Sequence, residues 1–461
     1  MKHISFRRLW ITFLTIFTLN LLSACGTLNI QFITPTKELA TLPISTSTPE
    51  TLDPPQALAP TLTLVPSEIP TIDTTSPIAP MTVPTLASAV SIEYIRMKDA
   101  NTGWAIGELN GGTSDMILST QDGGKTWLNI TPSHAFDEIG TDNESAIAYF
   151  SNASNAWVFY YNKDQTPLGG KSAMIWSTTD GGQTWIGSSP LDLTNVNMEF
   201  FKPSDIDFSD TQHGWIMIHV GNGMMHDYVT IFNTIDGGKS WNKVVDPTQQ
   251  SLPQGCYKNG IVFLDASAGW VAGDCQGVQS GVYFYKTNDS GQTWTTQTLP
   301  APSTEPNAFS SGQQQEACGA YPPQFINAKV GFMSVKCGIP NPNTQTETTW
   351  PYITSDGGGT WTALPALPEP VGTLSFLDDK TGWFLGATSA DASQATHAMY
   401  QTVDGGKTWK QLTKLSWSGQ MDFISADVGW VVASDANNQA LVETTNGGAT
   451  WQEILPVVIS N

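Results

Sequence analysis

The stretch STQDGGKTW, at residues 119–127, decides the fold because the chain repeats it. Six more copies follow, from STTDGGQTW at 177–185 to ETTNGGATW at 443–451. Each copy ends in Trp, and its fourth residue is acidic in every copy but the last: Asp122, Asp180, Asp236, Asp289, Asp356, Asp404 and Asn446. A motif that recurs every roughly 40 to 70 residues indicates a chain built from structural repeats.

A second motif runs in phase with the first. A large apolar residue is followed six positions later by Gly-Trp or a close variant, as in FLDASAGWVAG at 263–273. The Trp of this motif is found at positions 104, 215, 270, 383 and 430, and the variants are Ala156–Trp157 and Gly331–Phe332. Each of the seven repeats therefore carries two registered motifs.

The repeat at residues 260–300 predicts the secondary structure. It holds four short apolar runs, IVFL, GWVA, VYFYK and TWTTQTL, which turn-forming residues separate. Val, Phe, Tyr, Trp and Thr dominate these runs, as is typical of strands, and no helical 3.6-residue period appears. Four antiparallel strands in each of seven repeats predict an all-β protein, a seven-bladed β-propeller over residues 89–461.

The first motif has a physical role in this fold. Its Asp-Gly-Gly lies where the third strand turns into the fourth, and glycines accept the positive φ of a tight hairpin. The Asp side chain is expected to accept hydrogen bonds from backbone N–H groups of its own turn, and the Asn of the last copy can do the same. The Trp is expected to anchor the outer strand by burying a large apolar area.

The first motif resembles the Asp-box, also called the bacterial neuraminidase repeat. The joint pattern, Phe-x-Asp-x-x-x-Gly-Trp followed by Thr-x-Asp-Gly-Gly-x-Thr-Trp, resembles the photosystem II assembly and stability factors, seven-bladed propellers of cyanobacteria and chloroplasts. The resemblance covers roughly residues 90–458. It implies a noncatalytic protein that binds another protein during assembly, in photosynthesis for that family.

The N-terminus predicts export. Lys2, Arg7 and Arg8 precede an apolar stretch, and LSAC at 22–25 resembles a bacterial lipobox. We expect residues 1–24 to be a lipoprotein signal peptide and Cys25 to carry lipid; the alternative is an uncleaved N-terminal membrane anchor. Residues 25–88 are rich in Thr, Pro and Ser, which predicts a disordered linker. The propeller would then lie outside the cytoplasm, lipid-anchored to the bacterial cell membrane.

The charge of the chain excludes some partners. Of 20 basic and 41 acidic residues, removal of residues 1–24 takes three basic and no acidic ones, leaving 17 against 41 and a net charge of −24. Nucleic acid needs basic contacts to its phosphates, and anionic lipid surfaces attract basic segments. We therefore expect no nucleic-acid partner and no membrane contact except through the lipid anchor.

The remaining cysteines form two pairs with the same spacing. Cys256 and Cys275 lie 19 residues apart in the fourth repeat, and Cys318 and Cys337 lie 19 apart in the fifth. In each pair one Cys is expected at the start of the first strand and the other at the end of the second, where antiparallel pairing brings them together. We predict disulfides 256–275 and 318–337; free thiols and a four-Cys zinc site, which normally has CxxC spacing, are the alternatives.

No catalytic set emerges from the sequence. Sialidases share the Asp-box, but their resemblance implies several Arg residues that hold a substrate carboxylate, and only Arg96 follows residue 24. Glycoside hydrolases use a pair of acids, and no pair can be selected among the acidic residues. The histidines have no metal-ligand spacing. We predict a protein that is not an enzyme and holds no cofactor and no metal.

What remains is a binding surface. The loops that join the second and third strands share one face of a propeller with the connections between blades, and several of them are long. The expected binding residues on this face are Tyr160, Tyr161, Met224, Met225, His226, Trp350 and Trp417. We expect a monomeric scaffold or assembly factor that binds an unidentified protein; the alternative is a glycan-binding module or glycoside hydrolase that acts on a cell-surface glycan.

Overall fold

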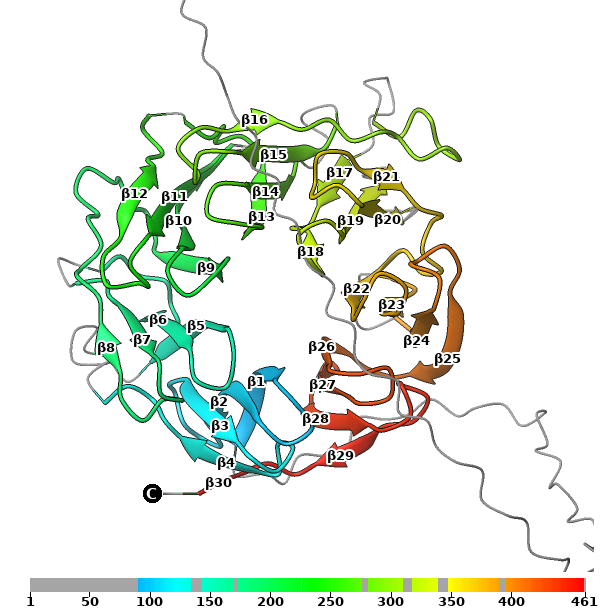
Figure 1. Ribbon diagram of the computed structural model, residues 1–461, viewed down its shortest axis with the longest axis horizontal. Helices are drawn as coiled ribbons and strands as arrows, with labels where there is room; N and C mark the ends of the chain where they lie inside the picture. Colours follow the sequence, from blue (N-terminus) through cyan, green and yellow to red (C-terminus); the bar gives the residue numbers. More distant parts are fainter. Residues whose placement is uncertain are drawn as a thin grey trace, which may run out of the picture. The chain divides into compact units, whose positions relative to one another are not determined.

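The computed structural model describes residues 90–133, 143–168, 172–224, 226–249, 251–275, 281–309, 317–338, 347–389 and 395–459. Within these ranges every regular element is a β-strand (Figure 1), and no helix long and apolar enough to span a membrane is found there. The predicted signal peptide, Cys25 and the predicted linker, residues 25–88, lie outside the described residues.

Most of the strands form antiparallel sheets of four consecutive strands. The first sheet holds β1 (Val90–Met97), β2 (Gly103–Leu109), β3 (Met116–Thr120) and β4 (Thr126–Asn129). The second holds β5 (Glu144–Phe150), β6 (Ala156–Asn162), β7 (Ile175–Thr178) and β8 (Ile186–Gly187). The third holds β9 (Lys202–Phe208), β10 (Gly214–Gly223), β11 (His226–Thr234) and β12 (Asn242–Val245).

The next sheet has nine strands: β13 (Tyr257–Phe263), β14 (Gly269–Asp274), β15 (Tyr283–Thr287), β16 (Thr295–Thr296), β17 (Ala317–Ala320), β18 (Gln324–Phe325), β19 (Gly331–Gly338), β20 (Glu347–Thr354) and β21 (Thr362–Ala363). A further sheet holds β22 (Val371–Phe376), β23 (Gly382–Ala387), β24 (His397–Thr402) and β25 (Lys410–Leu415). The last holds β26 (Ser418–Phe423), β27 (Gly429–Ser434), β28 (Gln439–Thr444) and β29 (Gln452–Ile454).

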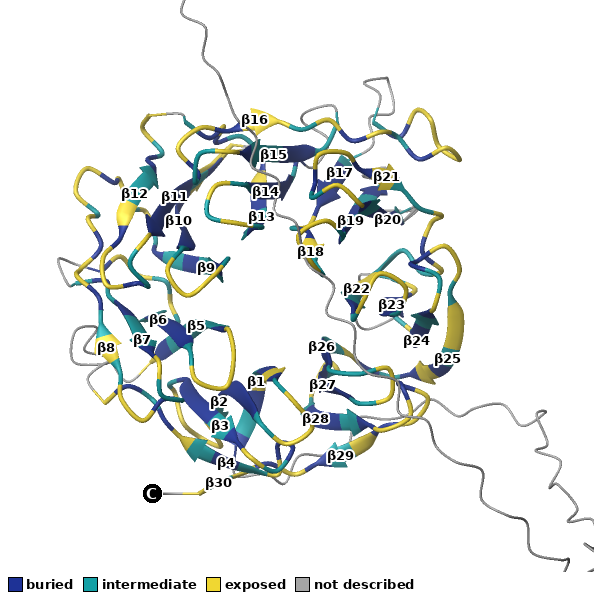
Figure 2. Cartoon of the chain, in the orientation of Figure 1, coloured by how far each residue is buried: buried dark blue, intermediate teal, exposed yellow. Residues whose placement is uncertain are grey.

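The sheets follow one another around a ring, with their first strands toward the centre (Figure 1). Strands of neighbouring sheets pack together, such as β5 with β9, β9 with β13, β22 with β26, and β26 with β1. The second strand of each sheet is almost wholly buried (Figure 2). This is the arrangement of a β-propeller, and it confirms the predicted all-β class with antiparallel four-stranded sheets.

The two sequence motifs meet between neighbouring sheets. Trp383, from a Gly-Trp pair, stacks on Phe423 of the next sheet with the ring centroids 3.7 Å apart. Trp451, which ends the last Asp-box, packs its edge against the same Phe423. Trp215 and Phe263 form the same stack at 3.6 Å. Aromatic residues bury much area, so these contacts hold neighbouring sheets together.

Hydrogen bonds of the Gly-Trp indoles also cross between sheets. The indole N–H of Trp383 donates to the carbonyl of Gly447 in the Asp-box of the next sheet, at 2.8 Å. Equivalent bonds join Trp157 to Gly237, Trp215 to Ser290, and Trp430 to Gly123. Each of these Asp-boxes therefore closes its own hairpin and also accepts a hydrogen bond from the indole of the neighbouring sheet.

Within each Asp-box the acidic side chain acts as predicted. Its Oδ1 accepts the backbone N–H four residues later, at 2.9–3.0 Å in all seven copies. Asn446 makes this bond through its amide oxygen, and its amide N–H group donates to Thr450. The two glycines of the first copy, Gly123 and Gly124, have φ of +77° and +90°, which L-residues rarely adopt.

Side chains of some innermost strands join adjacent sheets near the centre of the ring. Asp207 on β9 accepts the backbone N–H of Phe263 on β13, at 2.6 Å. Equivalent bonds lead from Phe376 to Gln324 and from Met97 to Asp422. Burial raises the pKa of Asp207 to about 6 and that of its neighbour Asp205 to about 7.

The ring is closed by its two ends. Strand β30 (Val457–Ile459), near the C-terminus, pairs in parallel with β4 of the first sheet. In the centre, Arg96 of β1 forms a 2.8 Å ion pair with the buried Asp422 of β26. Contacts between residues more than 300 positions apart therefore join the first and last sheets.

Candidate functional site

Both predicted disulfides are present. Cys256, just before β13, is joined to Cys275, just after β14, with Cα atoms 4.4 Å apart. Cys318 of β17 lies directly opposite Cys337 of β19 and is bonded to it, with Cα atoms 4.1 Å apart. Both pairs lie at the open ends of their hairpins, on the side of the ring away from the Asp-boxes, as the spacing predicted.

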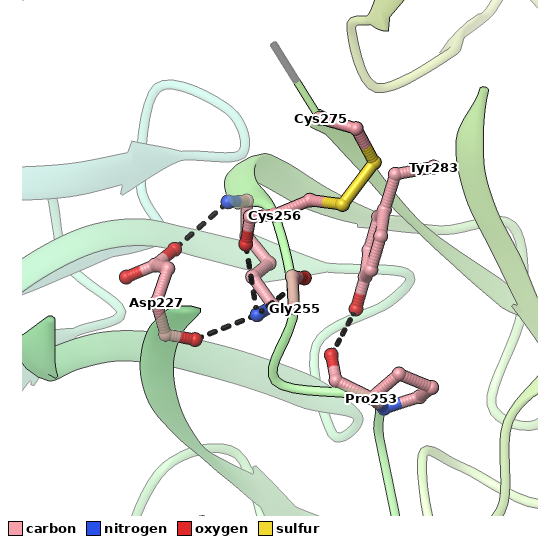
Figure 3. Close-up of a disulfide and its surroundings, with 7 residues drawn as sticks. Asp227, Pro253, Gly255, Cys256, Cys275 and Tyr283 are labelled. Atoms are coloured by element: carbon pink, nitrogen blue, oxygen red, sulfur yellow. Dashed lines mark hydrogen bonds between the residues drawn. A yellow bond between two sulfur atoms is a disulfide. The ribbon is translucent and has the colours of Figure 1, made fainter. Parts of the chain in front are cut away.

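A buried lysine holds the loop that carries Cys256. Cys256 has φ +63°, an unusual value for a residue with a side chain. The ammonium group of Lys258 donates to the carbonyls of Asp227, Gly255 and Cys256, at 2.6, 3.2 and 3.1 Å (Figure 3). Burial lowers the pKa of Lys258 to about 8. The three N–H groups of the Lys258 ammonium are matched by three backbone carbonyls, and these hydrogen bonds hold the loop in place.

The carboxylate of Asp227 connects this loop to a histidine. Its Oδ2 accepts the backbone N–H of Lys258 at 2.8 Å, and its Oδ1 lies 2.8 Å from Nδ1 of His219. A carboxylate at Nδ1 favours the tautomer with the proton on that nitrogen. Nε2 of His219 then carries a lone pair, and it is buried without a hydrogen-bond partner among the described residues. The His219 ring, 2% exposed, stacks on Tyr257 at 5.1 Å.

These groups line a cavity of about 400 Å³. It lies where the loop after β6 of the second sheet meets the third sheet and the nine-stranded sheet, beside the Cys256–Cys275 disulfide, and we call it the disulfide pocket. Its charged lining residues are Asp164, Lys202, Asp227 and Asp274, and His219, His226 and Tyr257 complete much of the wall. The pocket therefore combines a rigid wall, an unpartnered ring nitrogen and more carboxylates than cations.

Asp227 and His219 form an Asp–His pair at the wall of the disulfide pocket. An Asp–His pair activates a nucleophile when a hydroxyl or thiol lies within reach of the histidine. Among the described residues that line the pocket there is no Ser or Thr, both cysteines are oxidised, and the ring of Tyr257 is stacked on that of His219. Asp227 holds the ring of His219 in place, so Nε2 is a fixed hydrogen-bond acceptor at the wall of the pocket.

The structure corrects part of the predicted binding face. Tyr160, Trp350 and Trp417 are buried in the hydrophobic core, at 2%, 3% and 0% exposure, so they cannot contact a partner. Large aromatic residues in and beside the strands fill the space between sheets, as Trp417 does in the connection between β25 and β26 by packing against Trp451. Of the other predicted residues, Met224 and His226 are exposed and Tyr161 is half-buried.

Met224 is 94% exposed and His226 is exposed and lines the disulfide pocket. Tyr161 is half-buried and packs on the core between the second and third sheets. Met225 lies outside the described residues. The surviving part of the predicted face is therefore the tip of the β10–β11 hairpin, at the edge of the pocket.

One group of acids has the spacing of metal ligands. In the described ranges, carboxylate oxygens of Glu93, Glu108 and Asp115 lie within 4.8 Å of one another. The ammonium of Lys163 contacts Glu108 at 2.5 Å and Asp115 at 3.2 Å. Burial raises the pKa of both Glu93 and Asp115. Since Lys163 already occupies the position of a cation, we assign no metal to this group.

Sequence reasoning did not identify His219, Asp227 and Lys258 as a group. The β10–β11 hairpin itself was predictable, but its register shifts between His219 and Gly221. Beyond this irregularity Asp227 lies opposite Asn222, and its side chain reaches His219 diagonally across the hairpin. A polar His and Asp on one hairpin, followed by a Lys beside a cysteine, is too weak a pattern to select them.

No known family model matches the chain. One curated relative, the photosystem II assembly lipoprotein Ycf48 of Synechococcus sp. (strain CC9902), is 34% identical over 127 residues. The match covers 28% of this chain and 32% of the relative, so the chain spans about a third of that protein's length.

Solved structures are similar over most of the chain. A structure of YCF48 bound to a D1 peptide has 16% identity and a TM-score of 0.46, covering 81% of this chain and 99% of the other. An oligogalacturonate lyase from Vibrio parahaemolyticus has 9% identity and a TM-score of 0.51, covering 79% and 92%. The second likeness supports the fold alone. By its sequence match, which covers 28% of its length, the chain resembles a photosystem II assembly lipoprotein.

Proposed function

We propose that this protein is a noncatalytic scaffold or assembly factor, a monomeric seven-bladed propeller that binds another protein outside the cytoplasm. The nine-stranded sheet is counted as two blades, β13–β16 and β17–β21. Each half has its own Asp-box and its own disulfide. Since the ring is closed by strand β30 of the same chain, no second copy is needed to complete it.

The observation that carries this proposal is the disulfide pocket with its rim. Met224 and Tyr257, which are 94% and 44% exposed, lie on the two sheets that enclose the pocket. Met and Tyr are enriched in protein interfaces, and a wall fixed by a disulfide loses little entropy on binding. The curated relative, which is named an assembly lipoprotein, supports the same class of function.

A glycoside hydrolase needs two carboxylates that face each other across a substrate. Of the three carboxylates that line the disulfide pocket, Asp227 is already bound by His219 and by the backbone of Lys258, and Asp164 accepts the backbone N–H of Thr166. A protein partner is therefore the better assignment for this face.

Site-specific photo-crosslinking in native membranes tests the proposal. A photo-reactive residue is placed at Met224 or Tyr257 on the pocket side, and at Val403, an exposed Asp-box residue on the other side. We expect one protein adduct shared by the first two positions and absent at Val403. Adducts that are equal at all three positions contradict the assigned face. Saturable sugar binding on a glycan array, without a protein adduct, favours a glycan-binding module.

We further propose that lipid on Cys25 anchors the protein and that residues 25–88 form the linker. The lipobox-like LSAC supports this, and so does the lipoprotein name of the curated relative. The variant Cys25→Ala should move the full-length protein out of the membrane fraction. If the variant stays in that fraction, the N-terminal stretch itself is the anchor.

A further inference from the structure

We propose that the disulfide pocket binds a guanidinium group, presented by an arginine side chain of the partner protein. This inference rests on the proposed function and names the chemistry that the pocket recognises. It follows from the charges of the lining, from the unpartnered nitrogen of His219 and from the exposed aromatic ring beside them.

The charges in the pocket favour a cation. Asp164, Asp227 and Asp274 line it, against the single ammonium of Lys202. The buried ammonium of Lys258 lies behind the wall, and the carboxylates still outnumber the cations when it is included. The chain as a whole has 41 acidic and 20 basic residues, so its long-range field also attracts cationic partners.

The hydrogen-bonding groups favour a ligand that only donates. Nε2 of His219 offers a lone pair that no described residue uses, and the His219 side chain is 2% exposed. Asp227 fixes the ring, so this acceptor does not have to reorganise when a ligand binds. A guanidinium group has five N–H donors and no acceptor, and it pairs well with carboxylates.

The aromatic wall selects a flat cation over a compact one. Tyr257 is 44% exposed, its ring lies 5.1 Å from the ring of His219, and both residues line the same cavity. Guanidinium groups stack on aromatic rings, whereas an ammonium is a more strongly hydrated point charge. A buried acceptor, nearby carboxylates and a stacking surface together match the arginine side chain.

The test measures binding of a small probe to the purified full-length protein. N-acetyl-arginine methylamide is titrated by saturation-transfer difference NMR, with the neutral isostere N-acetyl-citrulline methylamide and the lysine analogue as comparisons. We expect saturable binding of the arginine probe that weakens at higher salt, and at least tenfold weaker binding of the other two. Equal binding of the citrulline or lysine probe, or no binding of the arginine probe, overturns the proposal.

A matched pair of variants locates the site. Asp164 lines the pocket and accepts the backbone N–H of Thr166 at 3.1 Å. Asp192 is exposed, is not a lining residue and accepts the N–H of Thr194 in the same way. Asn preserves either backbone bond, so both variants should fold. We expect Asp164→Asn to weaken arginine binding about tenfold and Asp192→Asn to leave it unchanged; equal effects overturn the assignment to this pocket.

The outcomes separate this inference from the proposed function. A protein adduct at Met224 without any binding of the arginine probe refutes the guanidinium site and leaves the scaffold function standing. Binding of the arginine probe that Asp164→Asn weakens supports the site, whatever the cross-linking shows. Absence of both refutes both.

Discussion

The bond from Trp383 to the neighbouring Asp-box should stabilise the ring measurably. Trp383 is fully buried, stacks on Phe423 and donates its indole N–H to the carbonyl of Gly447 at 2.8 Å. The variant Trp383→Phe keeps a ring for stacking, as Phe332 does naturally against Phe376, but it removes the donor. The carbonyl of Gly447 is then buried without its partner.

The chain offers a matched control on the same phenylalanine. Trp451 packs its edge against Phe423 and is 7% exposed, but its indole N–H has no acceptor among the described residues. Replacing either Trp by Phe loses roughly 40 Å² of apolar area, or about 1 kcal/mol. Only Trp383→Phe also leaves a buried carbonyl unpaired, which costs about 1–3 kcal/mol.

We therefore expect Trp383→Phe to lower the free energy of unfolding by about 2–4 kcal/mol, and Trp451→Phe by about 1 kcal/mol. Guanidinium-induced unfolding followed by far-ultraviolet circular dichroism measures both variants, and an unchanged slope shows that the same transition is compared. Equal losses for the two variants would falsify the claim that the indole bond joins the sheets. If only Trp451→Phe lowered the free energy of unfolding, the contact that stabilises the sheets would be that of the Asp-box Trp and not the indole bond of Trp383.

Three further outcomes follow from the described contacts. Asp404→Ala should lower the melting temperature more than Asp404→Asn, because an amide oxygen can still accept the N–H of the turn, as it does in the last Asp-box; equal shifts contradict this role. Burial holds the pKa of Asp205 at about 7 and that of Asp207 at about 6, above the unfolded value of about 4. The folded state therefore binds more protons between pH 4 and 7, so the free energy of unfolding should fall as the pH rises through this range, and Asp205→Asn should flatten that slope in denaturation curves. Replacing Cys256 and Cys275 together by Ser should cost roughly 3 kcal/mol, and an unchanged denaturation midpoint would show that this loop needs no cross-link.

Much of the ring could be predicted because its determinants are local. The hairpin of an Asp-box requires Gly residues at positive φ and an Asp that binds its own turn, and these residues lie within nine positions. The disulfides follow from the same locality, because Cys256 and Cys275 flank one pair of adjacent strands. Residues that interact within one hairpin are separated by a fixed number of positions, so their spacing can be recognised in the sequence.

The burial of the loop aromatics could not be predicted in this way. Tyr160, Trp350 and Trp417 belong to segments that the strand pattern placed on a binding face, yet each is in the core. Apolar rings look alike in a sequence whether they fill the gap between two sheets or project into solvent. Whether such a ring is buried or exposed depends on how closely the neighbouring sheet packs against it. That distance is set by the assembly of the whole ring of sheets.

The sequence by itself determined the repeat, the antiparallel order of four strands within a repeat and the pairing of the cysteines, because these depend on residues close together in the chain. Only the tertiary structure decided how the ring closes, with β30 on β4 and Arg96 on Asp422, and where the disulfide pocket lies. The pocket forms where the β10–β11 hairpin places His219 beside Asp227, and the next sheet then adds Lys258 behind the wall and Tyr257 in it. Contacts between sheets depend on the packing of whole surfaces, and no spacing of residues records them.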